Sequence, residues 1–146
     1  MQEVSELRTG AKLPDPRQLN PLQMAYLGDT LHDLYVRSAL LEHASSVGRM
    51  HKQAVRMVSA YAQARMLEAI EQELTPEEAD IARRGRNAQA KHAAPRHADP
   101  ADYAHATGLE ALWGYLYITG RSDRLTQLLT LALGRTEDIW QKQNSK

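Results

Sequence analysis

The sequence contains no cysteine, and several classes of site are therefore excluded. Without cysteine there is no disulfide framework, no zinc–thiolate site and no thiol nucleophile. The chain also lacks a glycine-rich phosphate loop, a histidine motif with zinc spacing and a nucleophile elbow around any serine. An excess of charge is missing as well, because 18 Lys and Arg residues balance 18 Asp and Glu residues. Taken alone, this neutrality argues against nucleic acid as a partner.

Targeting and membrane signals are missing too. No basic and then apolar leader opens the chain, so the N-terminus has no signal-peptide pattern. The apolar stretch from Tyr103 to Gly120 is too short, and too often interrupted by polar residues, to cross a membrane. The length of 146 residues is sufficient for one domain with its own core. We expect a cytoplasmic protein with no membrane contact.

The charges are unevenly distributed along the chain. Residues 43–67 contain no acid, and neither do residues 81–98. A neutral chain with such segments can still present a basic face. We therefore predict RNA or phosphate contacts in these two segments, while a solvated connector remains the alternative for the second. The candidate RNA-binding residues are Lys52, Arg56, Arg83, Arg84, Arg86, Asn87 and Lys91.

The apolar spacing predicts an all-α fold, and no segment alternates as a strand would. Asn20 before Pro21 is typical of a helix N-cap, and the apolar pattern then continues to about Leu41. A second helix is predicted over residues 50–74. Thr75, followed by proline and two acids, predicts the start of a third helix.

The third predicted helix leads into the second acid-free segment. Gly85, Pro95 and Pro100 indicate a helix end followed by a mobile basic loop. Asp99 or Asp102 then caps the helix that carries Glu110. We expect that helix to end at Gly120 and a last amphipathic helix to end near Gly134.

The first predicted helix is apolar on two sides. One stripe consists of Met24, Leu27, Leu31, Leu34 and Leu41, and the opposite one of Leu22, Ala25, Tyr26, Val36 and Leu40. A helix with two apolar faces is central to its fold. These stripes present more apolar surface than one domain of this size covers, so we expect a second copy to cover the remainder.

Two isolated acids lie within the apolar helical segments. Asp29 follows a Leu-Gly step in the first helix, and Glu110 is the one carboxylate between Tyr103 and Gly120. Hard cations such as Mg²⁺ commonly use one or two protein carboxylates together with waters and phosphates. The acids could instead be buried ion-pair partners, for example of His105 or Arg37. Asp33, one turn after Asp29, is an additional candidate ligand.

These motifs resemble the ribonuclease III endonuclease-domain family. The run at residues 25–31, AYLGDTL, is similar to the signature helix in which an aromatic-Leu-Gly-Asp sequence supplies a metal-binding aspartate. The run at residues 110–115, EALWGY, is similar to the family's second acidic motif. The size, the RRGRNAQAK segment and the lack of a double-stranded-RNA-binding domain resemble the Mini-ribonuclease III branch.

The sequence departs from larger relatives at two positions. They carry a glutamate where this chain has Ala25 and an aspartate where it has Thr107. The resemblance therefore assigns catalytic and metal-binding roles to Asp29 and Glu110 alone. It leaves open the number of metal ions and any compensating role of Asp33. The Mini-ribonucleases III share this reduced set.

The resemblance implies a Mg²⁺-dependent endoribonuclease that acts as a two-fold homodimer on double-stranded RNA. It implies products with 5′-phosphates and a role in ribosome biogenesis, the maturation of both ends of precursor 23S ribosomal RNA. Residues 19–134 would form the catalytic domain, between an irregular arm at 1–18 and a tail at 135–146. Two alternatives remain: an inactive relative that binds RNA or ribosomes, and a plain helical interaction domain.

Overall fold

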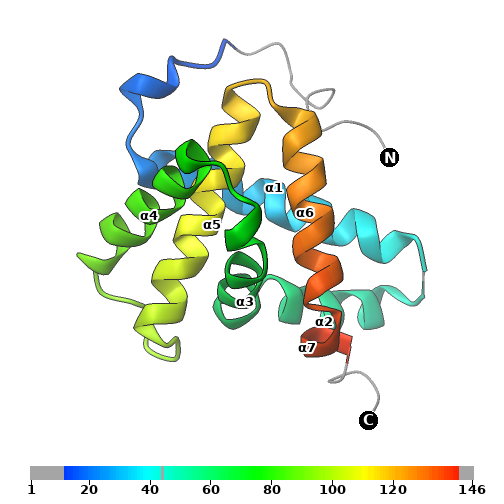
Figure 1. The fold of residues 1–146 in the computed structure, drawn as a ribbon. Helices are drawn as coiled ribbons and strands as arrows, with labels where there is room; N and C mark the ends of the chain where they lie inside the picture. Colours follow the sequence, from blue (N-terminus) through cyan, green and yellow to red (C-terminus); the bar gives the residue numbers. More distant parts are fainter. Residues whose placement is uncertain (1–11, 44, 142–146) are drawn as a thin grey trace.

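The computed structural model describes residues 12–43 and 45–141, and these residues form helices joined by short connections (Figure 1). The α-helices are α1 (Pro21–Leu41), α2 (Val47–Met57), α3 (Ala60–Ile70), α4 (Pro76–Ala90), α5 (Pro100–Ile118), α6 (Ser122–Arg135) and α7 (Glu137–Gln141). Short 3₁₀ helices, η2 (Pro16–Gln18) and η3 (Glu71–Glu73), precede α1 and follow α3. No strand occurs in the described ranges, so the predicted all-α fold is confirmed.

The start of α1 follows from its capping residues. The side chain of Asn20 accepts a hydrogen bond from the backbone N–H of Gln23, and the side chain of Gln23 accepts one from the backbone N–H of Asn20, each at 2.9 Å. This reciprocal pair satisfies two amide groups that a helix start otherwise leaves without a partner. The predicted cap at Asn20 and the predicted end at Leu41 are both confirmed.

Helix α5 is the centre of the molecule. It contacts α1, α3, α4 and α6, and in Figure 1 it runs between α4 and α6. Leu109, Leu112, Trp113 and Leu116 on α5 are fully buried. Burial of an apolar side chain of this size stabilises the fold by about 1.5–3 kcal/mol. The four side chains therefore make α5 a large contributor to the stability of the core.

Helices α1 and α5 touch backbone to backbone because glycines face the contact. A Cβ atom on Gly28 would lie 1.7 Å from the carbonyl oxygen of Glu110, and one on Gly114 would lie 2.0 Å from that of Met24. Neither position has room for a side chain. The close approach fixes the residue after Gly28, which is Asp29, beside Glu110.

The predicted second helix over residues 50–74 is wrong, because the chain breaks after Met57. Ser59 causes the break with its hydroxyl group. Its Oγ donates to the carbonyl oxygen of Arg56 at 2.8 Å and accepts from the backbone N–H of Ala62 at 3.1 Å. The same side chain thus ends α2 and caps α3. Local hydrogen bonding by serine competes with helix continuation at such a site.

Gly85, which together with Pro95 and Pro100 predicts the helix end, does not end the helix. Thr75 caps α4 as expected, but the helix continues to Ala90. Gly85 lies inside it because the contact with α5 needs a small residue there: a Cβ on Gly85 would lie 2.8 Å from the Cβ of Ala111. Four of the candidate RNA-binding residues therefore lie on a helix, and the connector is shorter than predicted.

The C-terminal part matches the predicted boundaries closely. Asp99 caps α5, and the chain turns at Gly120, whose φ of 75° lies in the left-handed region that favours glycine. Helix α6 ends at Arg135, one residue beyond the predicted stop at Gly134. The short helix α7 lies within the predicted tail and contacts α2 and α6. Residues 1–11 of the predicted arm and 142–146 of the tail lie outside the described residues.

Candidate active site

Asp29 and Glu110 line one pocket of about 440 Å³, on α1 and α5 respectively. The crossing of these helices at Gly28 brings them together. The remaining lining residues come from α1, α3, α4, α5 and the break between α2 and α3. They are Leu22, Ala25, Tyr26, Val58, Ala60, Gln63, Gln89, Tyr103, Ala106 and Thr107. The structure therefore places the two acids in a common pocket, as the two motifs predict.

The two acids differ in burial, and neither has a cationic partner. Asp29 is exposed to solvent, contrary to the expectation from its apolar helix, whereas Glu110 is partly buried. No salt bridge in the described part of the chain joins either carboxylate to a Lys, Arg or His. Arg37 instead pairs with Asp33, and the Nδ1–H of His105 donates to the carbonyl oxygen of Ala101 at 2.7 Å. The predicted ion-pair partners are therefore occupied elsewhere.

Burial raises the pKa of Glu110 to about 9, and a hydrogen bond with Asp29 and its negative charge add to this rise. A hydrogen bond from Gln63 opposes it. In the metal-free protein the Glu110 carboxyl group thus holds a proton at neutral pH. Two acids that share one site behave this way because ionising the second costs Coulomb energy. A divalent cation between them would remove that cost.

The set of donors fits a hard cation. Carboxylate oxygens are the ligands that Mg²⁺ prefers, and Mg²⁺ commonly takes only one or two of them with waters and substrate phosphates. Asp29 and Glu110 are the residues that would hold it. No group of three or more His, Asp or Glu side chains suited to a metal occurs in the described ranges.

The two departures from the larger relatives lie in the wall of this same pocket. Ala25 and Thr107 both line it. The hydroxyl group of Thr107 donates to the carbonyl oxygen of Tyr103 at 3.0 Å, and alanine offers no ligand at all. Asp33 does not line the pocket and forms a 3.1 Å salt bridge with Arg37. The structure thus gives no support to Asp33 as a replacement ligand.

Gln63 on α3 was missed by the sequence analysis. It is 3% exposed, and its Nε2 donates to the carbonyl oxygen of Val58 at 2.9 Å and to Oε2 of Glu110 at 3.5 Å. The available signal was a neutral polar residue among the apolar positions of α3. A polar residue in a helix usually lies at the surface, so the sequence alone did not distinguish Gln63 from a surface glutamine.

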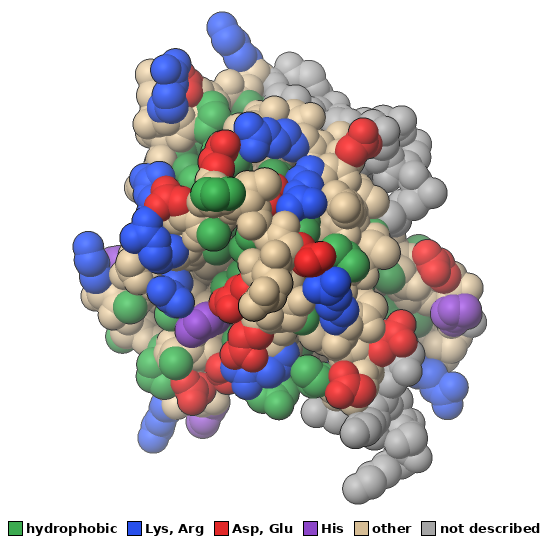
Figure 2. Space-filling view, viewed as in Figure 1, with side chains coloured by type: hydrophobic (Ala, Val, Ile, Leu, Met, Phe, Trp, Pro, Cys, Tyr) green, Lys and Arg blue, Asp and Glu red, His purple; other side chains and the backbone are tan. Residues whose placement is uncertain are grey.

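Two of the candidate RNA-binding residues on α4 lie next to the acidic pocket. Arg86 and Asn87 line a neighbouring pocket of about 310 Å³, which shares Gln89 and Tyr103 with the acidic pocket. Arg83 and Arg84 are exposed, and Arg83 pairs with Asp80. Figure 2 shows Lys and Arg side chains gathered on the left, over α4, with acids among them.

The remaining candidates lie on other segments. Lys91 is exposed at the C-terminal cap of α4. On α2, Lys52 is exposed and Arg56 is partly buried. The candidates on α4 and Lys91 therefore belong to one helix and its C-terminal cap, whereas Lys52 and Arg56 belong to α2. Their roles in RNA binding stay predictions.

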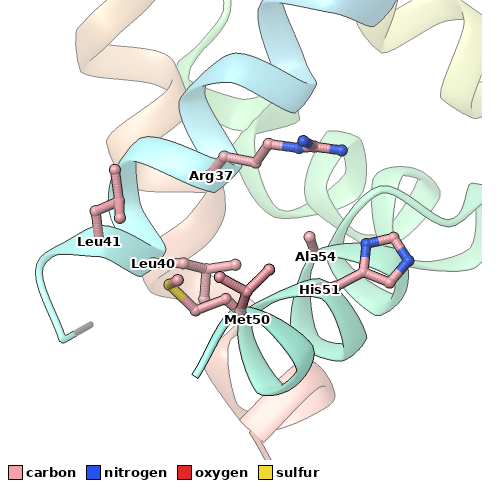
Figure 3. Close-up of a pocket in the computed structure, with 7 residues that line it drawn as sticks. Arg37, Leu40, Leu41, Met50, His51 and Ala54 are labelled. Atoms are coloured by element: carbon pink, nitrogen blue, oxygen red, sulfur yellow. The ribbon is translucent and has the colours of Figure 1, made fainter. Parts of the chain in front are cut away.

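A different pocket, of about 230 Å³, lies between the end of α1 and α2 (Figure 3). Its walls are formed by Arg37, Leu40, Leu41, Val47, Met50, His51 and Ala54. Because no carboxylate lines it, this pocket is unsuited to a divalent cation. No helix in the described part of the chain is both long and apolar enough to span a membrane.

Comparisons with known proteins identify the family of this chain. The model of the ribonuclease III domain family matches residues 22–121, which include both acids. The chain is 48% identical over 122 residues to the Mini-ribonuclease 3 of Symbiobacterium thermophilum, covering 83% of this chain and 93% of that protein. It is 40% identical over 121 residues to the Mini-ribonuclease 3 of Synechocystis, covering 83% and 82% of the two chains.

The fold has a solved counterpart as well. A crystal structure of a protein from Fusobacterium nucleatum superposes with a TM-score of 0.75 at 24% identity, covering 84% of this chain and 98% of that one. At this identity the likeness shows the fold alone. The family match and the curated relatives show more: the chain belongs to the ribonuclease III family of endoribonucleases, in the Mini-ribonuclease III branch.

Proposed function

We propose that this protein cleaves double-stranded RNA with Mg²⁺ as its cofactor and Asp29 and Glu110 as its catalytic, metal-binding residues. The observation that carries the proposal is the convergence of these two acids, without cationic partners, in one pocket. When bound, Mg²⁺ supplies the positive charge that stabilises a phosphodiester transition state. The two carboxylates would hold the ion, and Glu110 would give up its proton on binding it.

The substrate class follows from the basic residues beside the pocket. Arg83, Arg84, Arg86 and Asn87 on α4, with Lys91, offer cations and an amide to backbone phosphates, and Lys52 and Arg56 on α2 would add to them. Duplex RNA is recognised mainly by its shape and phosphates, because its deep major groove is closed to side chains. These groups suit that kind of recognition.

A homodimer is part of the proposal. Both apolar stripes of α1 leave large side chains exposed at their edges: Tyr26 is 86%, Leu34 39% and Leu41 62% exposed. Val47 and Val55 on α2 add exposed apolar surface nearby in sequence. A two-fold dimer would cover these side chains and would present two acidic pockets to one duplex.

Precursor 23S ribosomal RNA is the proposed natural substrate, as resemblance to the Mini-ribonucleases III implies. The test incubates the protein with Mg²⁺ and one of three RNAs: a precursor 23S transcript with its paired ends, an unrelated duplex and a single strand. We expect cleavage of both duplexes with 5′-phosphate products, at defined positions near the mature ends in the precursor. Cleavage of the single strand alone would contradict the proposed substrate class.

A further inference from the structure

The side chain of Gln63 connects the acidic pocket to the break between α2 and α3. Its Nε2 lies 2.9 Å from the carbonyl oxygen of Val58 and 3.5 Å from Oε2 of Glu110. A carbonyl oxygen only accepts hydrogen bonds, so the atom facing it must be the amide nitrogen. This contact fixes which end of the amide faces Glu110. The nitrogen has two hydrogens, one for each partner.

The other end of the same amide has no partner. Oε1 of Gln63 is buried and accepts no hydrogen bond within the described structure. Leaving a buried acceptor without a partner costs free energy, and in a native protein such a group usually reflects a constraint other than stability. The conformation of Gln63 thus satisfies its two donor contacts at the expense of its acceptor.

The carbonyl that anchors Gln63 lies next to a buried chain of hydrogen bonds. The adjacent carbonyl, of Met57, lies 3.1 Å from Nε2 of His32, whose Nδ1 lies 3.2 Å from Nε1 of Trp113. The indole N–H and the carbonyl fix the tautomer, so His32 accepts from Trp113 and donates to Met57. Trp113 lies on α5 one turn from Glu110. The end of α2 is therefore tied to the helix that carries the acid.

We propose that Gln63 is a positioning residue for cation binding: its amide nitrogen holds the Glu110 carboxylate in the orientation that receives Mg²⁺. The inference rests on the proposed Mg²⁺ dependence. A neutral donor suits this task, because Lys or Arg would neutralise the carboxylate and compete with the cation, and an acid would repel it. Hydrogen bonds in a ligand-free active site are often long and shorten when the complex forms, which accounts for the 3.5 Å distance.

The test uses Gln63→Met, which keeps the side chain's length and removes the amide. Gln53→Met on α2 is the control, since Gln53 is partly buried and lines a different pocket. The first readout is the thermal stability of the RNA-free protein during a Mg²⁺ titration. The second is the Mg²⁺ concentration that gives half-maximal cleavage of duplex RNA.

We expect Gln63→Met to need about tenfold more Mg²⁺ in both readouts, the size of effect that loss of a partner to a metal ligand typically has. Cleavage should recover at high Mg²⁺, whereas Glu110→Gln should stay inactive at every concentration. Gln53→Met should match the wild type. A purely structural role would lower the melting temperature without moving the Mg²⁺ midpoint, and that result would overturn the inference.

The outcomes also separate this inference from the proposed function. If the wild type cleaves without regard to Mg²⁺, the proposed cofactor fails. If the wild type depends on Mg²⁺ and Gln63→Met has the same midpoint, only the inference fails. Gln63→Asn is the second variant: its amide is one methylene shorter and spans the two partners poorly, so it should also raise the midpoint. Loss of folding in both variants at every Mg²⁺ concentration would make Gln63 structural and overturn the proposal.

Discussion

At the scale of single residues, Glu110 is the acid whose pKa burial raises to about 9. Its carboxyl is partly buried next to Asp29, with an amide rather than a cation as its other neighbour. Such an arrangement stabilises the folded protein poorly when no cation is bound. It is suited to a site that exchanges a proton for a metal ion, since the ligand must lose its proton when the ion enters.

The first prediction concerns the pH dependence of stability without Mg²⁺. The pKa of Glu110 is about 9 in the folded protein against 4.5 for the free side chain. Between these values the folded state holds the proton and the unfolded state does not, so the free energy of unfolding falls as pH rises. Glu110→Gln should lose this slope and be more stable than the wild type near pH 8.

Thermal melts at a series of pH values, in a chelating buffer, measure the difference in stability between the wild type and Glu110→Gln. Addition of Mg²⁺ should narrow it, because the ion binds the ionised carboxylate of the wild type and gives the variant no such gain. The same dependence of melting temperature on pH in both proteins would show that the pKa of Glu110 is not raised in the folded protein, and would contradict this prediction.

At the scale of elements, the site depends on the contact between α1 and α5. Gly28 belongs both to the signature motif and to this contact, so one position serves the fold and the pocket. Replacing Gly28 with alanine should destabilise the protein by about 3 kcal/mol or more, since overpacking a tight contact forces the backbone apart. The Mg²⁺ midpoint of any folded fraction should rise as the two acids separate.

Gly48→Ala is the control for this prediction. Gly48 lies in the first turn of α2, and a Cβ there would meet nothing within 4 Å. Its stability should be unchanged or higher by about 0.4–1 kcal/mol, because alanine restricts the unfolded chain. Chemical denaturation of both variants gives the comparison. Equal stabilities would mean that the close approach of α1 and α5 is not required.

The elements also show what the sequence could predict. The capping residues Asn20 and Thr75 predicted the starts of α1 and α4, and Asp99 was one of two predicted caps for α5, because the chemistry of a cap is local. Ser59 was missed because its cap lies in the middle of a continuous apolar pattern. Gly85 was misread because its partner Ala111 is distant in the chain. Local signals are visible in one sequence, whereas a tertiary contact that tolerates only glycine is not.

The same distinction applies to the candidate site. Asp29 and Glu110 were identified as isolated acids and through their motifs, and the structure places them in one pocket. The exposure of Asp29 was not expected, because both sides of α1 read as apolar. The role of Gln63 depends on where α2 ends, which the periodicity did not reveal. Their functions in catalysis remain predictions.

At the scale of the whole molecule, we expect a second copy of the protein to cover the exposed apolar side chains of α1. Tyr26 is the best probe, because it is 86% exposed and its replacement disturbs no core. Met24, an equal candidate from the sequence, is 2% exposed and belongs to the core with Ala25, Ile81 and Ala111. Tyr26→Asp should therefore yield a folded monomer by ultracentrifugation. Because Tyr26 also lines the acidic pocket, the oligomeric state, and not cleavage, is the readout for this variant. A fully active wild-type monomer at micromolar concentration would contradict the dimer.

The basic surface makes a second prediction at this scale. Neutralising Arg83, Arg84, Arg86 and Lys91 together should weaken binding to duplexes of any sequence and flatten the salt dependence of affinity. The slope of log affinity against log salt should fall in magnitude by up to about 0.9 for each lost phosphate contact. Turnover at saturating RNA should change much less. Unchanged affinity and slope would make these residues a solvated surface.

The central claim is that Asp29 and Glu110 together hold the catalytic cation. Cleavage of duplex RNA by Asp29→Asn and Glu110→Gln, measured across a Mg²⁺ titration beside duplex binding, tests it most directly. Both changes keep the shape of the side chain and remove its charge, so folding, dimer formation and RNA affinity should persist. We expect cleavage to be lost in both variants at every Mg²⁺ concentration. Cleavage at the wild-type rate by both variants would contradict the account.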